Sequence, residues 1–249
     1  MITTIHYKSK KIQIDLSKPL DISIAIGSPN QQVLAWYTKN PKIDPVKNND
    51  WVGSVEQGAC VNFNNIFFNP HAHGTHTECV GHITKQAVSI NACLKQFFFI
   101  TELITVAPET LGDDLVISKK QLQFALGNKK RDSVLIRTLP NTNQKYGAQY
   151  YKTNPPYLLE EAAIYLKEKG IKHLLIDLPS VDKEQDHCKL LAHRAFWNVN
   201  GVVRTDATIT ELVFVPNTIN DGSYLLNLQI APFENDATPS KPVLYKIEN

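Results

Sequence analysis

The stretch Pro156-Tyr-Leu-Leu-Glu-Glu-Ala-Ala-Ile-Tyr-Leu-Lys-Glu-Lys-Gly-Ile-Lys-His-Leu-Leu-Ile-Asp177 joins a helix pattern directly to the pattern of a buried strand. Pro156 suits a first helical turn, apolar residues recur at helical spacing as far as Leu166, and Gly170 suits the C-terminal cap. These signals predict a helix over residues 156–169. The apolar run at 173–177 is typical of a strand buried on both faces.

Outside this stretch the chain alternates between further strand and helix signals. Ser118 and Gly127 bracket a shorter helix, and a third helix is expected from Asp186 to about Phe196. Strands grouped with a few helices predict an α/β or α+β domain. No Gly/Ser linker, low-complexity tract or repeat divides the 249 residues, so we expect one domain over residues 1–249. The remaining strands are expected at residues 12–16, 134–137, 212–215, 225–230 and 243–247.

Composition excludes several classes of protein. Hydrophobic residues make up 43% of the chain and charged residues 20%, as in an ordinary globular domain, and the net charge is +2. The basic run Lys129-Lys130-Arg131 follows turn residues, which favours a solvated surface over a nucleic-acid patch. No segment approaches the roughly 20 apolar residues of a membrane span, and no apolar signal-peptide stretch follows the early lysines. We expect no nucleic-acid or membrane partner.

Cysteine usage indicates a reducing compartment. The four cysteines form no CxxC pair and are too few for a disulfide framework in a chain of this size, so we expect a cytoplasmic protein. Cys79 lies within a histidine-rich segment. A packed thiol is the expected role of Cys79, and a thiolate ligand is the alternative.

That segment reads Asn-Pro-His-Ala-His-Gly-Thr-His-Thr-Glu-Cys-Val-Gly-His over residues 69–82. Four of the chain's eight histidines lie here beside one carboxylate, and neutral imidazole with carboxylate is a ligand set that zinc and related divalent ions accept. The alternative is a polar loop whose histidines are solvated or hydrogen-bonded. We predict a metal or catalytic site made from His71, His73, His76, Glu78 and His82.

Local geometry refines this prediction. The stretch 61–68 before the segment is aromatic and β-branched, so the cluster is expected at a strand end rather than on a helix. Side chains two apart on a strand share a face, so His76 and Glu78 can point at one ion. Gly74 offers turn or bulge geometries that could swing either His71 or His73 towards the same ion. His71 is favoured because it has the longer reach, which leaves His73 to orient a ligand or contact substrate.

The segment resembles the signature His-x-Gly-Thr-His-x-Asp-x-Pro-x-His of the cyclase family of metal-dependent hydrolases, which includes the bacterial kynurenine formamidases. Further matching segments follow in the same order along most of the chain, at residues 134–138, 155–163, 170–182 and 236–243. The resemblance implies the swivelling β/β/α architecture of that family, an amide, lactam or ester substrate, and a homodimer or homotetramer.

The resemblance also implies two distal metal ligands, His193 and Glu211. The residues alone favour a hydrogen-bonded core histidine for His193 in its apolar setting and a surface carboxylate at a strand end for Glu211, and the resemblance reverses both interpretations. His82 would be either a ligand of a second ion or the general acid that protonates the departing group. Asp177 and Asp182 flank a strand end where active-site loops are common, although a turn-stabilising role fits them as well.

Three departures from the signature bear on the substrate. Ala72 stands where the family has its first histidine, Glu78 replaces the usual aspartate, and Val80 replaces the proline. The segment between His193 and Glu211 is also longer than is common in the family. The sequence thus predicts a retained metal site without fixing the formamidase substrate.

Other catalytic classes lack their motifs. The chain has no G-x-S-x-G elbow, no G-x-G-x-x-G and no G-x-x-x-x-G-K-[ST] loop. The remaining chemistry is metal-assisted hydrolysis, in which a bound ion makes water acidic and polarises a carbonyl. We expect one or two divalent ions, zinc first and manganese as the alternative. The competing hypothesis is a non-catalytic relative that binds a metal or a small molecule.

Overall fold

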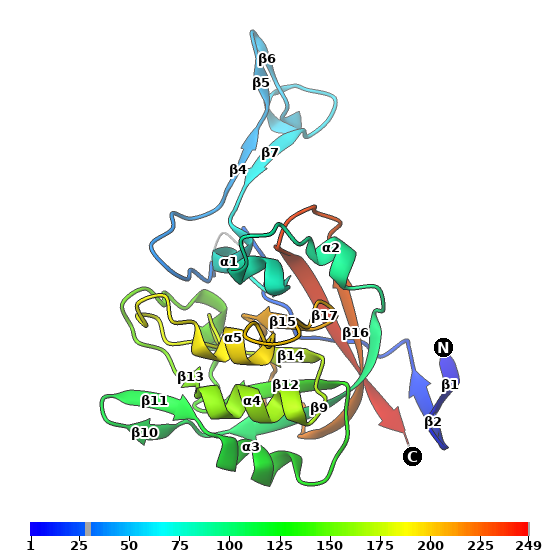
Figure 1. Ribbon diagram of the computed structural model, residues 1–249. Helices are drawn as coiled ribbons and strands as arrows, with labels where there is room; N and C mark the ends of the chain where they lie inside the picture. The colour runs from blue at the N-terminus through cyan, green and yellow to red at the C-terminus, as the bar shows by residue number, and fades with distance from the viewer. Residues whose placement is uncertain (28–30, 249) are drawn as a thin grey trace.

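A mixed sheet that closes on itself forms the centre of the protein (Figure 1). The structure, a computed structural model, describes residues 1–27 and 31–248. Seven strands form the closed part of the sheet, in the spatial order β17 (Ala237–Glu248), β16 (Gly222–Ile230), β9 (Phe98–Val106), β12 (Ser133–Thr138), β14 (His173–Ile176), β15 (Thr208–Glu211) and β8 (His76–Glu78). β8 pairs with β15 on one side and with β17 on the other, which closes the circuit. The strands β9, β12, β14 and β15 are parallel to one another.

Smaller elements extend from this barrel. An arm over residues 42–67 stands away from the rest of the chain (Figure 1) and consists of β4 (Lys42–Pro45) paired with β7 (Asn64–Phe67) and β5 (Lys47–Asn48) paired with β6 (Trp51–Val52). The other strands are β1 (Ile2–Tyr7), β2 (Lys10–Asp15), β3 (Leu20–Asp21), β10 (Glu109–Leu111), β11 (Asp114–Ile117) and β13 (Tyr157–Leu158). The helices are α1 (Pro70–His73), α2 (Ile90–Cys93), α3 (Lys119–Leu126), α4 (Glu160–Glu168) and α5 (Leu191–Phe196), with 3-10 turns at Val55–Gln57, Val80–Ile83 and Asn143–Gly147.

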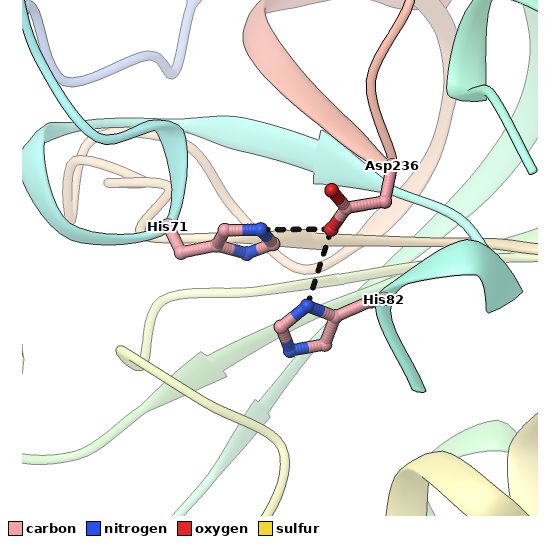
Figure 2. A group of neighbouring side chains, drawn as sticks. All are labelled: His71, His82 and Asp236. Atoms are coloured by element: carbon pink, nitrogen blue, oxygen red, sulfur yellow. Dashed lines mark hydrogen bonds and ion pairs between the residues drawn. The ribbon is translucent and has the colours of Figure 1, made fainter. Parts of the chain in front are cut away.

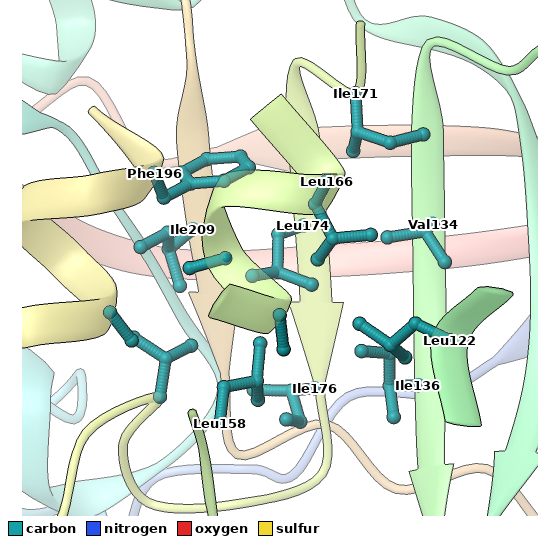
Figure 3. Close-up of a cluster of buried hydrophobic side chains, with 14 of the residues drawn as sticks. Leu122, Val134, Ile136, Leu158, Leu166, Ile171, Leu174, Ile176, Phe196 and Ile209 are labelled. Atoms are coloured by element: carbon teal, nitrogen blue, oxygen red, sulfur yellow. The ribbon is translucent and has the colours of Figure 1, made fainter. Parts of the chain in front are cut away.

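The parallel strands β12 and β14 are buried along their whole length, as their consecutive apolar residues predicted. Val134 and Ile136 of β12 belong to the cluster that the helices α3, α4 and α5 cover, whereas Leu135 belongs to the cluster that fills the barrel (Figure 3). β14 repeats the pattern, with Leu175 in the barrel cluster. Successive side chains of a strand point to opposite faces, so the part of a strand that lies between two cores is apolar at consecutive positions.

The predicted α/β class with a mixed β core and a few helices is confirmed, and most of its elements lie where the sequence placed them. The helix after Ser118 has the full capping box, in which the Ser118 hydroxyl accepts from the backbone N–H of Gln121 and the Gln121 side chain accepts from that of Ser118. The expected strands at 12–16, 134–137, 173–177, 225–230 and 243–247 overlap β2, β12, β14, β16 and β17, although β2, β16 and β17 begin two, three and six residues earlier than expected.

Two predicted helix starts and one predicted strand are wrong. The helix expected at 156–169 begins only at Glu160, because residues 157–158 pair with β11 instead. The helix expected from Asp186 begins at Leu191, since His187, Cys188 and Leu190 all have left-handed backbones that a right-handed helix cannot include.

The strand expected at 212–215 is the third error. Pairing ends at Glu211, and Leu212 follows with a φ of 53°, which turns the chain out of the sheet. Val213 makes only an isolated bridge with Ser23. The apolar run is buried nonetheless, because it packs into two core clusters as a loop. The apolar run at 212–215 therefore predicted burial correctly but predicted the wrong secondary structure.

None of the helices within residues 1–27 and 31–248 combines the length and the apolar content that crossing a membrane requires.

Buried His173 at the start of β14 predicts a loss of stability in acid. Its ring lies 3.9 Å from the Phe99 ring centroid, its Nδ1 is 2.9 Å from the Thr208 hydroxyl, and burial lowers the pKa of His173 to about 4. The unfolded chain takes up this proton near pH 6.5, so the free energy of unfolding falls as the pH drops from there towards 4. Between about pH 7.5 and about pH 4.5 the loss from this residue should be about 2–3 kcal/mol.

Urea unfolding of the wild type, His173→Gln and a control, His187→Gln at an exposed position, measures this loss. The wild type and the control should lose more stability than His173→Gln over the same pH interval. Equal losses in all three would show that His173 does not titrate in this window.

Candidate metal centre

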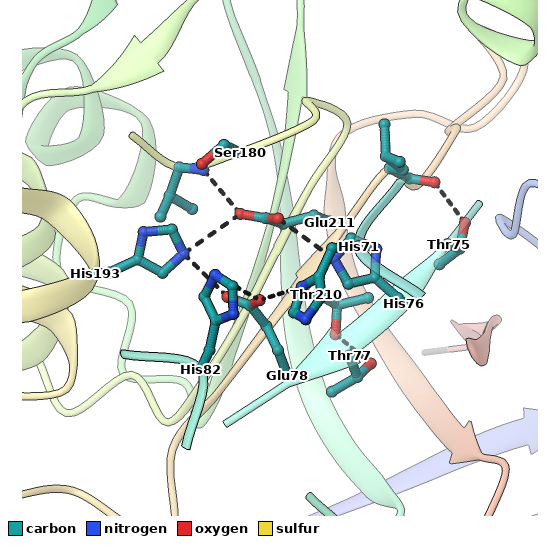
Figure 4. A network of polar contacts seen from close by, with 12 residues as sticks. His71, Thr75, His76, Thr77, Glu78, His82, Ser180, His193, Thr210 and Glu211 are labelled. Carbon is teal, nitrogen blue, oxygen red and sulfur yellow. Dashed lines mark hydrogen bonds and ion pairs between the residues drawn. The ribbon is translucent and has the colours of Figure 1, made fainter. Parts of the chain in front are cut away.

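Pairing between β8 and β15 brings His76 and Glu211, two of the predicted site residues, together. Glu211 lies directly opposite His76 in the antiparallel register, and Ile209 lies opposite Glu78. Thr77, between them in sequence, points to the other face, where its hydroxyl is 2.8 Å from that of Thr210. The alternation places His76, Glu78 and Glu211 on one face of the barrel wall (Figure 4).

His71 reaches the same face from α1, which corrects the expected strand geometry. Asn69 caps this single turn by accepting from the backbone N–H of His71, and Pro70 occupies its first position. Helical residues two apart are rotated by roughly 200° about the axis. His71 and His73 therefore point in nearly opposite directions.

His71 lies at the centre of the polar cluster. Its Nδ1 is 3.1 Å from Oε2 of Glu78, and its Nε2 is 3.0 Å from Oδ2 of Asp236. Although burial disfavours the charged ring, the hydrogen bonds to Asp236 and Glu78 raise the pKa of His71 to about 10. Its ring lies 5.2 Å from that of His76 and 4.2 Å from that of His82, centroid to centroid.

His73 lies apart from the cluster. Its Nδ1 accepts from the backbone N–H of Asn69 at 2.8 Å, and its Nε2 donates to the carbonyl of Lys39 at 2.8 Å. Burial lowers the pKa of His73, which suits a neutral ring with one donor and one acceptor nitrogen. His73 ties α1 to the loop before the arm.

Gly74 contributes through close packing rather than through an unusual backbone. Its φ of 171° is an extended conformation open to any residue, so the expected turn or bulge geometry is absent at this position. A Cβ at Gly74 would lie 2.8 Å from both the Ile24 carbonyl oxygen and the Ile26 side chain. The glycine lets α1 and β8 lie against the segment 24–26.

His193 enters the cluster from α5, with Asp182 behind it. The Asp182 carboxylate accepts from the backbone N–H groups of Ala192 and His193 at 2.6 and 3.1 Å, and from Nδ1 of His193 at 2.6 Å. This contact fixes the ring so that Nε2 lies 3.0 Å from Oε1 of Glu78. Burial disfavours the charged ring, but Asp182 and Glu78 hold the pKa of His193 well above its usual range.

His82 and Asp236 form the more open side of the cluster (Figure 2). His82 lies on the 3-10 turn Val80–Ile83, with 31% of its side chain exposed, and its Nδ1 is 3.2 Å from Oδ2 of Asp236. Its other nitrogen is 3.8 Å from Oε2 of Glu78. The same Asp236 oxygen contacts His71, and these two histidines hold the pKa of Asp236 well below its usual range.

Glu211 closes the cluster from the end of β15. Its Oε1 accepts from the backbone N–H of Val181 at 2.8 Å, and its Oε2 is 3.4 Å from Nε2 of His76. The next residue, Leu212, holds a left-handed backbone that is rare outside glycine, and its carbonyl accepts from the Thr75 hydroxyl. Such strained positions persist where the surrounding structure enforces them and cluster at functional sites.

The donor set fits a divalent cation. His76 Nε2 is fully buried and has no hydrogen-bond partner among the described residues, which is costly without a ligand. Glu78 Oε2 is also fully buried and lies 3.1 Å from His71 Nδ1 and 3.8 Å from His82 Nε2. Burial would raise the pKa of Glu78, but the histidines around it hold that pKa well below its usual range. Within residues 1–27 and 31–248, three overlapping groups of residues each bring one ligand atom per residue within 4.8 Å of the others. The groups are His71, His76 and Glu78; Glu78, His82 and His193; and His71, His82 and Asp236.

The structure thus gathers six of the seven predicted site residues and separates His73 from them. Sequence reasoning missed Asp236, although it lies in one of the segments that resemble the family, and left open the role of Asp182, which positions His193. Cys79 points away from the cluster into the barrel core and donates to the Val88 carbonyl at 3.3 Å.

Imidazole and carboxylate groups on a closed mixed sheet define the candidate centre of a metal-dependent enzyme. The sequence model of the Cyclase family matches residues 14–183, and the chain belongs to that family. A kynurenine formamidase of Bacillus cytotoxicus is 27% identical over 93% of this chain and 96% of its own length.

Solved structures share the fold. Isatin hydrolase A from Labrenzia aggregata superposes with a TM-score of 0.68 at 14% identity, covering 93% of this chain and 94% of its own. A predicted metal-dependent hydrolase from Bacillus stearothermophilus gives a TM-score of 0.65 at 18% identity, covering 92% and 98%.

Proposed function

We propose that this protein is a metal-dependent hydrolase that cleaves a C–N bond of an amide or lactam other than a peptide bond, or an ester. The observation that carries the proposal is the buried meeting of His76, Glu78 and Glu211 across two paired strands, in which His76 Nε2 has no hydrogen-bond partner among the described residues. Family membership and the similarity to kynurenine formamidases and isatin hydrolases support hydrolysis and disfavour a non-catalytic binder.

Two overlapping metal positions are proposed, with zinc as the first candidate ion and manganese as the second. His71, His76 and Glu78 would hold one ion, and His193 with Glu211 the other, since Glu78 belongs to ligand groups on both sides. A divalent ion there would polarise a substrate carbonyl and make water more acidic at neutral pH. Asp182 would keep Nε2 of His193 directed inward through its contact with Nδ1.

His82 is proposed as the general acid, with ligation of the second ion as its alternative role. Among the clustered histidines it has the most exposed side chain, so it stands where a substrate would arrive. Asp236 contacts Nδ1 of His82 and orients the ring, so Nε2 of His82 would donate the proton to the departing amine or alkoxide.

Metal removal should abolish hydrolysis. Protein purified without a metal-affinity tag is expected to carry about one to two divalent ions per chain by elemental analysis. Assays with the formamide of kynurenine, isatin and simple aryl esters should show turnover that chelation reduces by at least about 100-fold and that zinc or manganese restores. Absence of bound metal after reconstitution, or turnover indifferent to chelation, would contradict the proposal.

A homodimer formed through the arm is the proposed assembly, with a homotetramer as the alternative. Two-stranded ribbons are marginally stable alone, yet the arm exposes a series of large apolar side chains, with Phe67 65% exposed. β7 leads directly to α1, so a partner that covers the arm would also steady His71. The exposed apolar residues of the arm are Ile43, Trp51, Val55, Val61, Phe63, Ile66 and Phe67.

Light scattering coupled to gel filtration tests this assembly. The wild type should run as a dimer or tetramer, whereas the double variant Ile66→Glu, Phe67→Glu should dissociate because charges enter an apolar interface. Phe124→Glu is the matched control, since Phe124 is 93% exposed on α3, away from the arm. A monomeric wild type, or an unchanged mass in the double variant, would contradict the proposal.

We further propose a cytoplasmic protein that acts as one domain over residues 1–249. All four cysteines are free thiols, which suits a reducing compartment. Strands from both ends of the chain, β2 and β17, pair with each other, which supports a single folding unit.

A further inference from the structure

A cavity lies at the edge of the parallel strands opposite the metal centre. Arg131 lies two residues before the start of β12, whereas Glu211 is the last residue of β15. Both strands are parallel to β14, which lies between them, so the two residues lie at opposite edges of the parallel strands. The cavity measures about 490 Å³ and is lined by residues of the β1–β2 turn and of the loop after α3. Its lining shares no residue with the metal centre. Its volume is in the range of small-molecule sites.

The rim of this cavity carries an excess of positive charge. Five of the lining residues are basic and none is acidic, although the whole chain has a net charge of only +2. The Lys8 ammonium stands 5.0 Å from the centroid of the Tyr7 ring, which lines the same cavity. The basic residues are Lys8, Lys10, Lys129, Lys130 and Arg131.

A buried carboxylate anchors part of this rim. Glu102 of β9 is 1% exposed, accepts from Nζ of Lys129 at 2.6 Å and from Nε of Arg131 at 3.1 Å, and accepts from the Ser223 hydroxyl at 2.7 Å. Arg131 also donates to Ser223 and to the Lys130 carbonyl, so the loop 129–131 is held in one shape.

The ammonium groups of the other rim lysines are available to a ligand in the cavity. Within the described part of the chain, no ion pair involves Lys8, Lys10 or Lys130. Asp132, which follows Arg131 in the chain, accepts from the Tyr7 hydroxyl at 3.2 Å. Like charges gathered on one rim create a local field that attracts anions.

The floor of the cavity is apolar. Ile12, Ile100 and Ile247 line it and also pack in the small core between the β1–β2 hairpin and the barrel. An inorganic ion would leave this surface in contact with water, whereas a ligand with an apolar body would cover it. The cavity is therefore complementary to a ligand that has both an anionic group and an apolar body.

We propose that this cavity binds a small organic anion in which an aromatic or aliphatic body lies on the isoleucine floor and a phosphate or carboxylate meets Lys8, Lys10 and Lys130. The site is separate from the metal centre and does not depend on the proposed hydrolysis. Its solvent-exposed ion pairs make binding sensitive to salt.

Phenyl phosphate, inorganic phosphate and phenol separate the two contributions. Titration of the full, metal-loaded chain followed by 1H–15N spectra should give saturable shifts at residues 8–10 and 128–131 with phenyl phosphate. Inorganic phosphate and phenol should each bind more weakly at the same positions. Equal affinity for phenyl phosphate and inorganic phosphate, or no saturable shifts there up to about 20 mM ligand, would overturn the proposal.

Matched lysine variants test the rim. Lys8→Ala with Lys130→Ala should weaken phenyl phosphate binding by at least about fivefold. Lys47→Ala with Lys120→Ala removes two exposed lysines outside the cavity and should leave binding unchanged. Thermal unfolding of both variants checks that the fold is intact. Equal weakening in the two pairs would mean that net charge, and not this cavity, attracts the ligand.

Discussion

His76→Ala is expected to lose bound metal and to reduce turnover by more than about 100-fold, beyond the usual effect of removing a group that merely orients a ligand. His76 is fully buried, and its Nε2 has no hydrogen-bond partner in the part of the chain that the structure describes, although it lies 3.4 Å from Oε2 of Glu211. Its other nitrogen lies 3.1 Å from the Gly74 carbonyl oxygen. The contact with Gly74 therefore orients the His76 ring, and Nε2 is the nitrogen that is available to bind a metal ion.

The fold should survive this substitution. His76 belongs to none of the apolar core clusters, and its strand stays paired with β15 and β17 through the backbone. Metal content, turnover and circular dichroism are measured together, with His187→Ala as an exposed control. Unfolding of His76→Ala under conditions where metal-free wild type stays folded would show that His76 is a structural residue.

His71→Ala and His73→Ala are expected to separate metal binding from positioning. His71 contacts both Glu78 and Asp236, so its loss should lower metal affinity by more than about 100-fold. His73 faces Asn69 and Lys39 instead, so His73→Ala should keep its metal and change turnover by about 10–100-fold through a displaced α1.

Metal occupancy at equal protein concentration decides between the two histidines. His73→Gln can still offer a donor to the Lys39 carbonyl, so it should recover part of the turnover lost in His73→Ala. His71→Gln should recover little, since an amide is a poor substitute for imidazole as a metal ligand. Loss of metal in His73→Ala with retention in His71→Ala would reverse the assignment.

The sequence by itself determined the features that local pattern controls. Consecutive apolar residues in β12 and β14 identified strands buried on both faces, and Ser118 with Gly127 identified a short helix between them. The period of two along β8 placed His76 and Glu78 on one face. Each of these depends on residues close in the chain, whose spacing alone sets their relative direction.

Only the tertiary structure decided which distant groups complete the site. Glu211 meets His76 through strand register, and Asp236 meets His71 and His82 across more than 150 residues, so no local spacing could reveal either contact. His71 and His73 diverge because Asn69 and Pro70 start a helical turn that apolar patterning does not register. The end of β15 at Leu212 likewise follows from long-range packing, since a buried apolar run reads the same in a strand and in a loop.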